Sequence, residues 1–437
     1  MKLMEELCNL KAETIDGYFV SEKMKAVWNV ELNMLKKVLE VCKKYDLKVI
    51  AGFGTLIGAV RHNGFIPWDD DIDLIMPRGD YEKLLKIGPS EFTGQFFFQS
   101  FFSEKKYYTG YAKIRCNDTC RLNEIGRLTE SHLNCGISID IFPFDILPKS
   151  KEDMLSLVTE EKYILNYLNL RGSLIRRLRV YDYYKKIKKF LSDYESFSDE
   201  ELFKLYRDNL EKHKNDSDIG GVILIFNRPE EICTFNKNFF DDVTMHTFEK
   251  LEIPIPKSYD IILSKYYGDW RTPIDYQRIP SKSKNVSSYF YDANRPYKEY
   301  FYNPVSLNFL RAKKIVELFF SYYKKKYEQK YNEYRLNYLL GTKFKNKKVI
   351  LWGAGVFLED YANKNGLDYT NLIGIVDKKG TLKGQQIANK TIYGLEDIET
   401  LKPDIVIITI VNYKKFRLKE VYEYISKKNI KVPISTL

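Results

Sequence analysis

Histidine and paired cysteine are scarce in this chain. Its 437 residues include four histidines and six cysteines, and none of the cysteines forms a Cys-x-x-Cys pair. Structural zinc sites are built from several such ligands at short spacing. The composition therefore argues against a zinc site.

Long apolar runs are missing as well. The longest, such as residues 405–411, are much shorter than the roughly 20 residues that span a bilayer. Residues 1–20 contain Glu5, Glu6 and Lys11 and lack the apolar segment of a signal peptide. We therefore expect a cytoplasmic protein with reduced thiols, for which peripheral contact with the inner face of the membrane stays open.

Basic residues are in excess, because 70 Lys and Arg stand against 59 Asp and Glu, for a formal net charge of +11. Lysines cluster at residues 185–189, 324–326 and 347–348. Such an excess suits an anionic partner, a nucleotide or an anionic membrane surface, and it suits solvated helix faces equally well. No nucleic-acid partner is expected.

The length of the chain predicts two domains of unequal size. In the first part, apolar residues at helical spacing predict a helix over residues 21–45, residues 151–214 are helical in character, and another helix is expected between Ser258 and Pro273. Apolar runs in the same part predict four strands, at residues 49–51, 71–76, 111–115 and 137–142. Pro77 and Pro143 are expected to end the second and the fourth of these strands.

The second part follows a Tyr- and Lys-rich helical stretch at residues 307–340, a plausible connector. After Gly341 a helix over residues 356–364 alternates with predicted strands at residues 348–352, 372–376 and 405–410. This alternation indicates a small doubly wound domain. The fold class expected for the chain is α/β (α+β).

An acidic segment at residues 69–73 is the most informative part of the sequence. Four carboxylates lie within five positions there. In a strand, Asp69, Asp71 and Asp73 would share one face. Like charges held so close repel one another, and a cation that prefers hard oxygen ligands, Mg²⁺ or Mn²⁺, would remove the conflict. The alternative is an acidic surface turn, which has no need of the neighbouring Trp68.

Glycines precede the acidic segment. Gly52, Gly54 and Gly58 follow the first predicted strand. A Gly-rich turn after a strand lets backbone N–H groups approach a phosphate closely. A plain turn is the alternative, but the position just before a metal-type acidic segment favours the phosphate interpretation.

Two further strands carry polar candidates. Asp140 alternates with isoleucines, so its carboxylate faces away from the apolar side and could complete a metal cage or act as a base. A capping role before a turn is the alternative. Lys113 and Arg115 share a strand face with Tyr111 and could hold donor phosphates, with ordinary surface charge as the alternative.

At these residues the chain resembles the LicD family. The matching segments are GTLIGAVRHNGFIPWDDDIDL from Gly54, ISIDIFPFDILP from Ile137 and SYDIILSKYYGDWRTP from Ser258, in the family's order. The family is similar to nucleotidyltransferase-fold enzymes, including the fukutin-related phosphotransferases. The resemblance implies a catalytic domain over residues 1–300, followed by a helical connector over residues 301–345.

The resemblance also implies roles for individual residues. It places Gly54 and Thr55 in a phosphate-facing turn, gives Asp71 and Asp73 to the catalytic metal and makes Asp140 the third carboxylate. The remaining candidate contacts to the donor are Gly52, Arg61, Lys113 and Arg115. Because family members transfer phosphocholine to lipopolysaccharide, teichoic acid or capsule, the implied reaction moves phosphocholine or a related alcohol phosphate from CDP-choline or another CDP-alcohol to a glycan and releases CMP.

The C-terminal part, residues 346–437, resembles small Rossmann-like domains of polysaccharide-synthesis proteins. Gly353 and Gly355 are present, Leu358 stands in place of the third glycine, and Asp377 lies about where a ribose-binding acid would be. A nucleotide or nucleotide-sugar at Gly353–Gly355 and a structural or docking module are both open.

Two other functions remain open for the chain. One is nucleotidyl transfer from an NTP by the same carboxylates, which would release pyrophosphate instead of CMP. The other is a non-catalytic scaffold that binds a nucleotide-sugar. The acidic residues argue against the scaffold, because a scaffold needs no metal cage.

Overall fold

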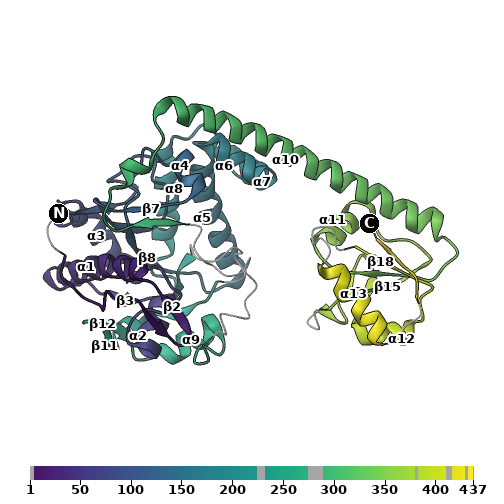
Figure 1. The fold of residues 1–437 in the computed structure, drawn as a ribbon, viewed down its shortest axis with the longest axis horizontal. Coiled ribbons are helices and arrows are strands. Elements are labelled where there is room, and N and C mark those ends of the chain that lie inside the picture. The colour runs from purple at the N-terminus through teal and green to yellow at the C-terminus, as the bar shows by residue number, and fades with distance from the viewer. Residues whose placement is uncertain are drawn as a thin grey trace. The chain divides into compact units, whose positions relative to one another are not determined.

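The structure is a computed structural model that describes residues 4–223, 232–273, 289–378, 382–409, 416–428 and 432–436. The chain divides into two compact units, residues 1–318 and residues 319–437, and each is described by itself. Both units combine helices with sheets, so the fold class is α/β (Figure 1).

A seven-stranded mixed sheet forms the centre of the first unit. Its strands run in the order β10-β9-β8-β4-β3, and β6 pairs with both β8 and β5. β4 and β8 are parallel, and the other pairs are antiparallel. The strands are β3 (Ile50–Ala51), β4 (Asp73–Pro77), β5 (Phe96–Gln99), β6 (Ala112–Cys116), β8 (Ser138–Ile146), β9 (Ile219–Gly221) and β10 (Phe235–Asn236).

Three two-stranded sheets surround the central one. They are β1 (Glu13–Ile15) with β2 (Tyr18–Val20), β11 (Val243–Phe248) with β12 (Leu251–Pro256), and β7 (Cys120–Leu122) with β13 (Phe290–Asp292). The last pair matters for the site, because it joins two segments that are far apart in the sequence.

Helices of the first unit cover the sheet and build a separate helical core. Those near the sheet are α1 (Glu22–Lys44), α2 (Phe53–His62), α3 (Arg78–Glu91), α4 (Glu124–Thr129) and α9 (Tyr259–Tyr267). The helical core consists of α5 (Lys151–Arg171), α7 (Tyr181–Phe190) and α8 (Asp199–His213). The short helix α6 (Leu174–Arg179) lies between α5 and α7 in the chain, and its Ile175 packs with Leu128 and Leu307. The helix predicted over residues 21–45 and the helical character of residues 151–214 are thereby confirmed. The helix predicted between Ser258 and Pro273 is confirmed as α9, which ends at Tyr267.

The first long helix shows how the sequence sets its boundaries. The Ser21 hydroxyl accepts the backbone N–H of Met24 and caps α1. Trp28, Leu32 and Leu35 are completely buried on one face, as their helical spacing predicts. The buried face holds α1 against the central sheet, next to the acidic segment.

Pro143 does not end its strand, contrary to the prediction, because β8 continues to Ile146. The N–H of Asp140 donates toward the β4 side of β8, so the nitrogen of Pro143, three residues later, faces the opposite side. On that side the start of β6, Ala112, pairs with Ile141, and the end of β9, Gly221, pairs with Asp145. Pro143 lies in the gap between them, where no partner needs the N–H that proline lacks.

The acidic segment also departs from the prediction. β4 begins only at Asp73, and residues 69–72 run before it without regular strand pairing. Asp69, Asp71 and Asp73 are therefore not neighbours on one strand face. Distant side chains hold this segment instead, as described below.

The second unit is a doubly wound sheet with helices. Its six strands have the order β16-β17-β15-β14-β18-β19, and all neighbours are parallel except β16 with β17. They are β14 (Val349–Trp352), β15 (Leu372–Val376), β16 (Gln386–Ile387), β17 (Lys390–Tyr393), β18 (Ile405–Ile408) and β19 (Ile434–Thr436). When the five parallel strands are numbered in chain order, their order across the sheet is 3-2-1-4-5 (β17-β15-β14-β18-β19). This order is typical of doubly wound sheets.

Helices accompany this sheet. They are α11 (Val356–Asn365), α12 (Ile398–Leu401) and α13 (Phe416–Lys427). A long helix, α10 (Pro304–Tyr338), begins in the first unit and continues into the second, where a π-helical turn (Leu339–Lys343) follows it. The strands predicted at residues 348–352 and 372–376 and the helix at 356–364 are confirmed; the end of the third predicted strand, Ile410, lies outside the described residues.

Candidate active site

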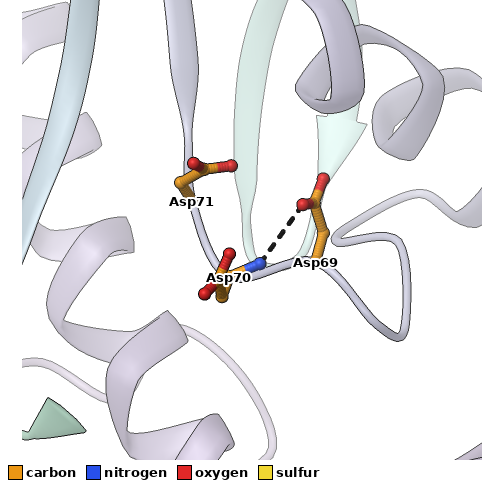
Figure 2. Close-up of side chains that lie close together, drawn as sticks. All are labelled: Asp69, Asp70 and Asp71. Carbon is orange, nitrogen blue, oxygen red and sulfur yellow. Dashed lines mark hydrogen bonds between the residues drawn. The ribbon is translucent and has the colours of Figure 1, made fainter. Parts of the chain in front are cut away.

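Three consecutive carboxylates form a compact acidic cluster just before β4. One oxygen from each of Asp69, Asp70 and Asp71 lies within 4.8 Å of the others, and all three side chains are half-buried (Figure 2). Such a separation brings like charges well inside the range at which they repel. The cluster is therefore an anionic centre that only a cation or bound protons can relieve.

Aromatic side chains from distant elements hold this acidic segment in place. The indole Nε1–H of Trp28 on α1 donates to the backbone oxygen of Asp69 at 3.0 Å. The hydroxyl of Tyr291 on β13 donates to Oδ2 of Asp70 at 2.7 Å. These bonds fix the path of the chain where it carries no strand pairing of its own.

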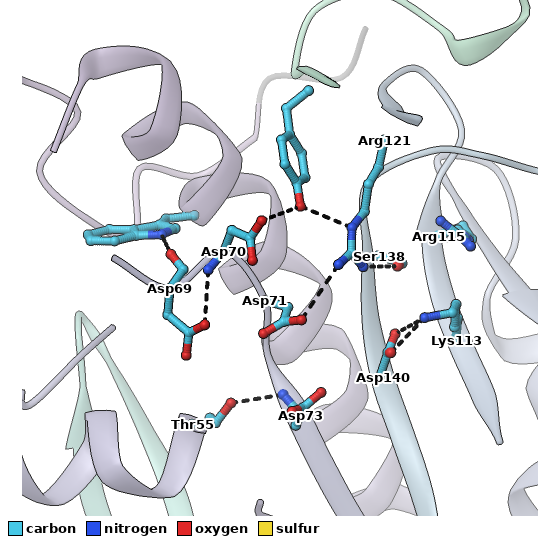
Figure 3. Close-up of polar contacts among 12 residues, drawn as sticks. Thr55, Asp69, Asp70, Asp71, Asp73, Lys113, Arg115, Arg121, Ser138 and Asp140 are labelled. Carbon is cyan, nitrogen blue, oxygen red and sulfur yellow. Dashed lines mark hydrogen bonds and ion pairs between the residues drawn. The ribbon is translucent and has the colours of Figure 1, made fainter. Parts of the chain in front are cut away.

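A row of three charged side chains crosses the central sheet beside the cluster. Asp73 of β4 lies opposite Asp140 of β8, and Asp140 lies opposite Lys113 of β6. The Lys113 ammonium donates to both carboxylate oxygens of Asp140, at 2.5 and 2.6 Å. The Thr55 hydroxyl accepts the backbone N–H of Asp73 at 2.8 Å and so fixes the start of β4 (Figure 3).

Arg121 on β7 joins the cluster to β13. Its Nη2 lies 3.5 Å from Oδ2 of Asp71, and its Nε donates to the Tyr291 hydroxyl at 3.1 Å. The guanidinium also lies over the Tyr289 ring, 4.8 Å from its centre. Arg121 and Tyr291 are direct partners in the β7–β13 ladder, so strand pairing places this cation at the carboxylates (Figure 3).

The electrostatics of the site favour a bound cation. Burial raises the pKa of Asp69, Asp71 and Asp73, and neighbouring carboxylates raise these pKa values further. Arg121 opposes the increase at Asp71. Clustered carboxylates whose ionised forms are disfavoured offer the hard oxygen ligands that Mg²⁺ and Mn²⁺ prefer. The residues present therefore fit a divalent cation.

Glu31 on α1 adds a further carboxylate near the acidic cluster. Its side chain is fully buried, and neither of its oxygens has a hydrogen-bond partner among the described residues. Burial raises its pKa, and Asp71 raises it further. A buried carboxylate without a partner is rare, because its desolvation is uncompensated.

The predicted glycines lie at the N-terminus of α2. Gly52 is the N-cap of this helix, and Gly54 stands in its first turn. A Cβ on Gly54 would lie 2.6 Å from Oδ2 of Asp69. The glycine thus leaves room for the Asp69 carboxylate, and the helix N-terminus with its free N–H groups faces the acidic region.

Two predicted donor contacts have partners elsewhere in the protein. Arg115 is buried, with Nε donating to Oε1 of Gln99 and Nη1 to the oxygen of Gly136, both at 2.7 Å. Arg61 donates to the backbone oxygen of Trp270 at 2.5 Å. Lys113 contacts a site carboxylate, whereas these two arginines are bound to the surrounding fold.

The structure brings together residues that sequence analysis did not select. Glu31, Arg121 and Tyr291 lie far from the acidic segment in the sequence, and other polar residues stand near each of them, so none is conspicuous. Sequence spacing could have indicated only the burial of Glu31, because residues three apart share a helix face and Trp28, three residues before it, is buried.

The second candidate site, at Gly353–Gly355, has a different character. The turn connects β14 to α11, as predicted, and Gly353 has a positive φ of 113°. Oδ2 of Asp377 accepts the backbone N–H of Ala354 at 2.8 Å. This acid therefore supports the turn itself.

Comparisons with known proteins cover both units. A family model described as LicD/FKTN/FKRP, nucleotidyltransferase domain, matches residues 47–164, and one described as C2185-like, N-terminal, matches residues 345–432. An uncharacterized protein of Rickettsia prowazekii is 33% identical over 113 residues, 25% of this chain and 37% of that protein. The crystal structure of RSP, a Rex-family repressor, is 22% identical over 24% of this chain and 57% of its own, with a TM-score of 0.18, from which nothing follows.

The lipopolysaccharide cholinephosphotransferase LicD of Haemophilus influenzae is similar over a larger part of the chain. It is 26% identical over 269 residues, which are 60% of this chain and 94% of that protein. The acidic cluster, Asp73, Lys113, Arg121 and Asp140 all lie inside the matched nucleotidyltransferase domain. Residues 47–164 therefore form a domain of the LicD/FKTN/FKRP nucleotidyltransferase family.

Proposed function

We propose that this protein is a metal-dependent transferase that moves phosphocholine, or a related alcohol phosphate, from a CDP-activated donor to a cell-surface glycan. The observation that carries the proposal is the crowded carboxylate centre beside the Asp73–Asp140–Lys113 row, inside the domain shared with LicD. The relative named a lipopolysaccharide cholinephosphotransferase supports phosphocholine as the transferred group.

Asp71 and Asp73, with Asp69 beside them, would hold Mg²⁺ or Mn²⁺. When bound there, the cation would neutralise charge on the donor pyrophosphate and on the leaving CMP. Metal binding also explains why the fold tolerates these carboxylates despite their repulsion.

Asp140 is positioned to receive a proton. The acceptor hydroxyl oxygen bonds to the phosphorus that bears the alcohol, the bond from this phosphorus to the bridging oxygen breaks, CMP leaves with that oxygen, and the hydroxyl proton passes to Asp140. Lys113 holds both Asp140 oxygens and thereby fixes the direction of the carboxylate. Burial lowers the pKa of Lys113 to about 8.

The phosphates need cationic and N–H partners. Among the described residues, Lys113 and Arg121 form ion pairs with Asp140 and Asp71, so these two cations already lie at the reacting region. The N-terminus of α2 at Gly52 and Gly54 supplies backbone N–H groups. Arg115 has no part in this proposal, because its donors serve the fold.

The test is a donor panel. The full chain with Mg²⁺ is incubated with CDP-choline, CDP-ethanolamine, CDP-glycerol and CDP-ribitol, and CMP release is measured; CTP is included, with pyrophosphate as its readout. We expect CMP from one CDP-alcohol, loss of this activity with Asp71→Asn, and no loss with Asp208→Asn, an exposed carboxylate on α8. Pyrophosphate from CTP without CMP from any CDP-alcohol would contradict the proposal and indicate nucleotidyl transfer.

A further inference from the structure

The part of α10 that belongs to the second unit exposes an unusual number of aromatic side chains. Seven rings between Phe319 and Tyr338 are each 47–73% exposed to solvent. They are Phe319, Phe320, Tyr323, Tyr327, Tyr331, Tyr334 and Tyr338. Large aromatic side chains usually bury most of their surface, so a continuous exposed series points to a missing partner.

These rings lie on one face of the helix. From Phe320 onward they recur at intervals of three and four residues, which keeps them on a single stripe. The stripe is not what anchors α10 to its unit. Asn332 and Leu336 are buried, and Leu336 belongs to the core of the second unit with the π-helical turn that follows.

Polar contacts confirm how α10 is attached. Oδ1 of Asn337 accepts hydrogen bonds from the hydroxyls of Tyr361 and Tyr369, at 2.5 and 2.6 Å. Glu333 accepts a hydrogen bond from Lys364 at 2.7 Å. The helix is thus held to its unit by other positions, and the seven rings are available to something else.

The charges around the stripe are mainly positive. The segment from Phe319 to Tyr338 contains five basic residues and two acidic ones, and one of the acids, Glu333, is paired with Lys364. Lys324, Lys326 and Lys330 lie between or beside the rings along the sequence. We call the seven rings and these three lysines the aromatic–lysine face.

We propose that the aromatic–lysine face lies on the surface of an anionic lipid bilayer. Tyrosine and phenylalanine rings insert at the level of the headgroups, with the tyrosine hydroxyls toward water, while lysine ammonium groups reach the lipid phosphates. None of the described helices is long and apolar enough to cross a membrane, so α10 would lie in the plane of the interface.

A second copy of the chain fits this face less well. Pairing two such faces would bring the lysines of both copies together, and like charges repel. It would also bury five tyrosine hydroxyls per copy in a seam, where each needs a hydrogen-bond partner. At a bilayer, the same charges are attracted and the same hydroxyls remain hydrated.

Vesicle flotation with the full chain tests this proposal, and it does not depend on the transferase activity. The vesicles contain either phosphatidylcholine alone or an equimolar mixture of phosphatidylcholine and phosphatidylglycerol. We expect binding to the anionic vesicles that weakens with added salt. Phe320→Gln/Tyr327→Gln/Tyr334→Gln should abolish it, and Lys324→Gln/Lys326→Gln/Lys330→Gln should weaken partitioning on the order of a hundredfold.

A matched control removes three exposed apolar side chains of the first unit. Phe19, Phe190 and Met245 are 52–65% exposed, so Phe19→Gln/Phe190→Gln/Met245→Gln should leave flotation unchanged. Circular dichroism establishes that the variants keep their helices, and light scattering gives the oligomeric state. Absence of flotation by the unaltered chain, flotation that survives loss of the three rings, or a dimer that only the ring variant dissociates would each overturn the proposal.

Discussion

The carboxylates of the two units differ in how the fold compensates their charge. In the first unit Asp69, Asp71 and Asp73 are crowded, and burial and mutual repulsion raise their pKa values. In the second unit, Asp377 accepts the backbone N–H of Ala354 and supports a glycine turn. The uncompensated crowding in the first unit indicates a ligand, whereas the hydrogen bond from Ala354 to Asp377 indicates a structural role in the turn.

The largest expected effect comes from removing a metal ligand. Asp71→Asn or Asp73→Asn should lower turnover by several orders of magnitude while the fold survives, because one of several repelling charges is removed. Asp377→Asn should leave turnover unchanged. Turnover and melting temperature measured for all three variants would check this, and near-normal metal-dependent turnover in either site variant would contradict the assignment.

Asp140→Asn should have the next largest effect. General-base contributions amount to about 10²–10⁴ in rate, so transfer should fall by a factor in this range. Donor affinity should change little, because Asp71, Asp73 and Arg121 remain. Turnover and donor affinity are measured on one preparation; a stable variant with full activity would exclude Asp140 from the reaction.

A comparison of two glycines should show a smaller effect. Gly54→Ala places a methyl group 2.6 Å from the Asp69 carboxylate, whereas a Cβ on Gly355 meets nothing within 4 Å. Gly54→Ala should reduce turnover on the order of ten- to a hundredfold, because a displaced carboxylate misaligns the site. Gly355→Ala should be neutral in the same assay, and equal rates for both variants would show that the position of Asp69 is unimportant.

The acidic centre should also make stability depend on pH. Raised pKa values mean that the folded state holds protons that the unfolded chain releases, so this contribution is present below the usual carboxylate range and is lost as the pH rises. The melting temperature of the metal-free protein should therefore fall as the pH rises from the usual carboxylate range toward neutral pH.

Two changes should flatten this dependence. Glu31→Gln removes one buried acid, and added Mg²⁺ should remove most of the slope because it stabilises the ionised carboxylates. Lys113, whose pKa is lowered to about 8, titrates above this window. A melting temperature of the metal-free protein that rises with pH over the same interval would contradict the raised pKa values of the crowded carboxylates.

The smallest effect is expected from removing the second unit. We predict that residues 1–318 fold by themselves and retain CMP release from the preferred donor with a soluble acceptor. The carboxylates and their partners all lie within these residues. Thermal unfolding and turnover of the truncated chain check the prediction, and loss of cooperative unfolding would show that the two units share a core.

The sequence predicted elements whose pattern is local. The buried face of α1, the strands β4 and β8 and the strand–helix alternation after Gly341 follow from apolar spacing within each segment. The path of residues 69–72 could not be predicted in this way. It depends on Trp28 and on Tyr291, which lies 221 residues away from Asp70.

The same reason limits the prediction of the site. Asp71, Asp73 and Asp140 stood out because acidic residues in apolar strands are conspicuous. Arg121 reaches Asp71 only because β7 pairs with β13, and a single arginine gives no signal of this pairing. Arg115 carries a similar sequence signal to Lys113, yet strand geometry directs its donors to Gln99 and Gly136.

Metal binding to the full chain tests the central claim most directly, and it requires no knowledge of the donor or the acceptor. Mn²⁺ is titrated into the unaltered protein, the Asp71→Asn/Asp73→Asn variant and the Asp377→Asn variant, and the free ion is followed by electron paramagnetic resonance. We predict saturable binding by the unaltered protein and by Asp377→Asn, and loss of this binding in the double variant. Equal Mn²⁺ binding by all three proteins would contradict the claim that the crowded carboxylates before and within β4 form the metal site.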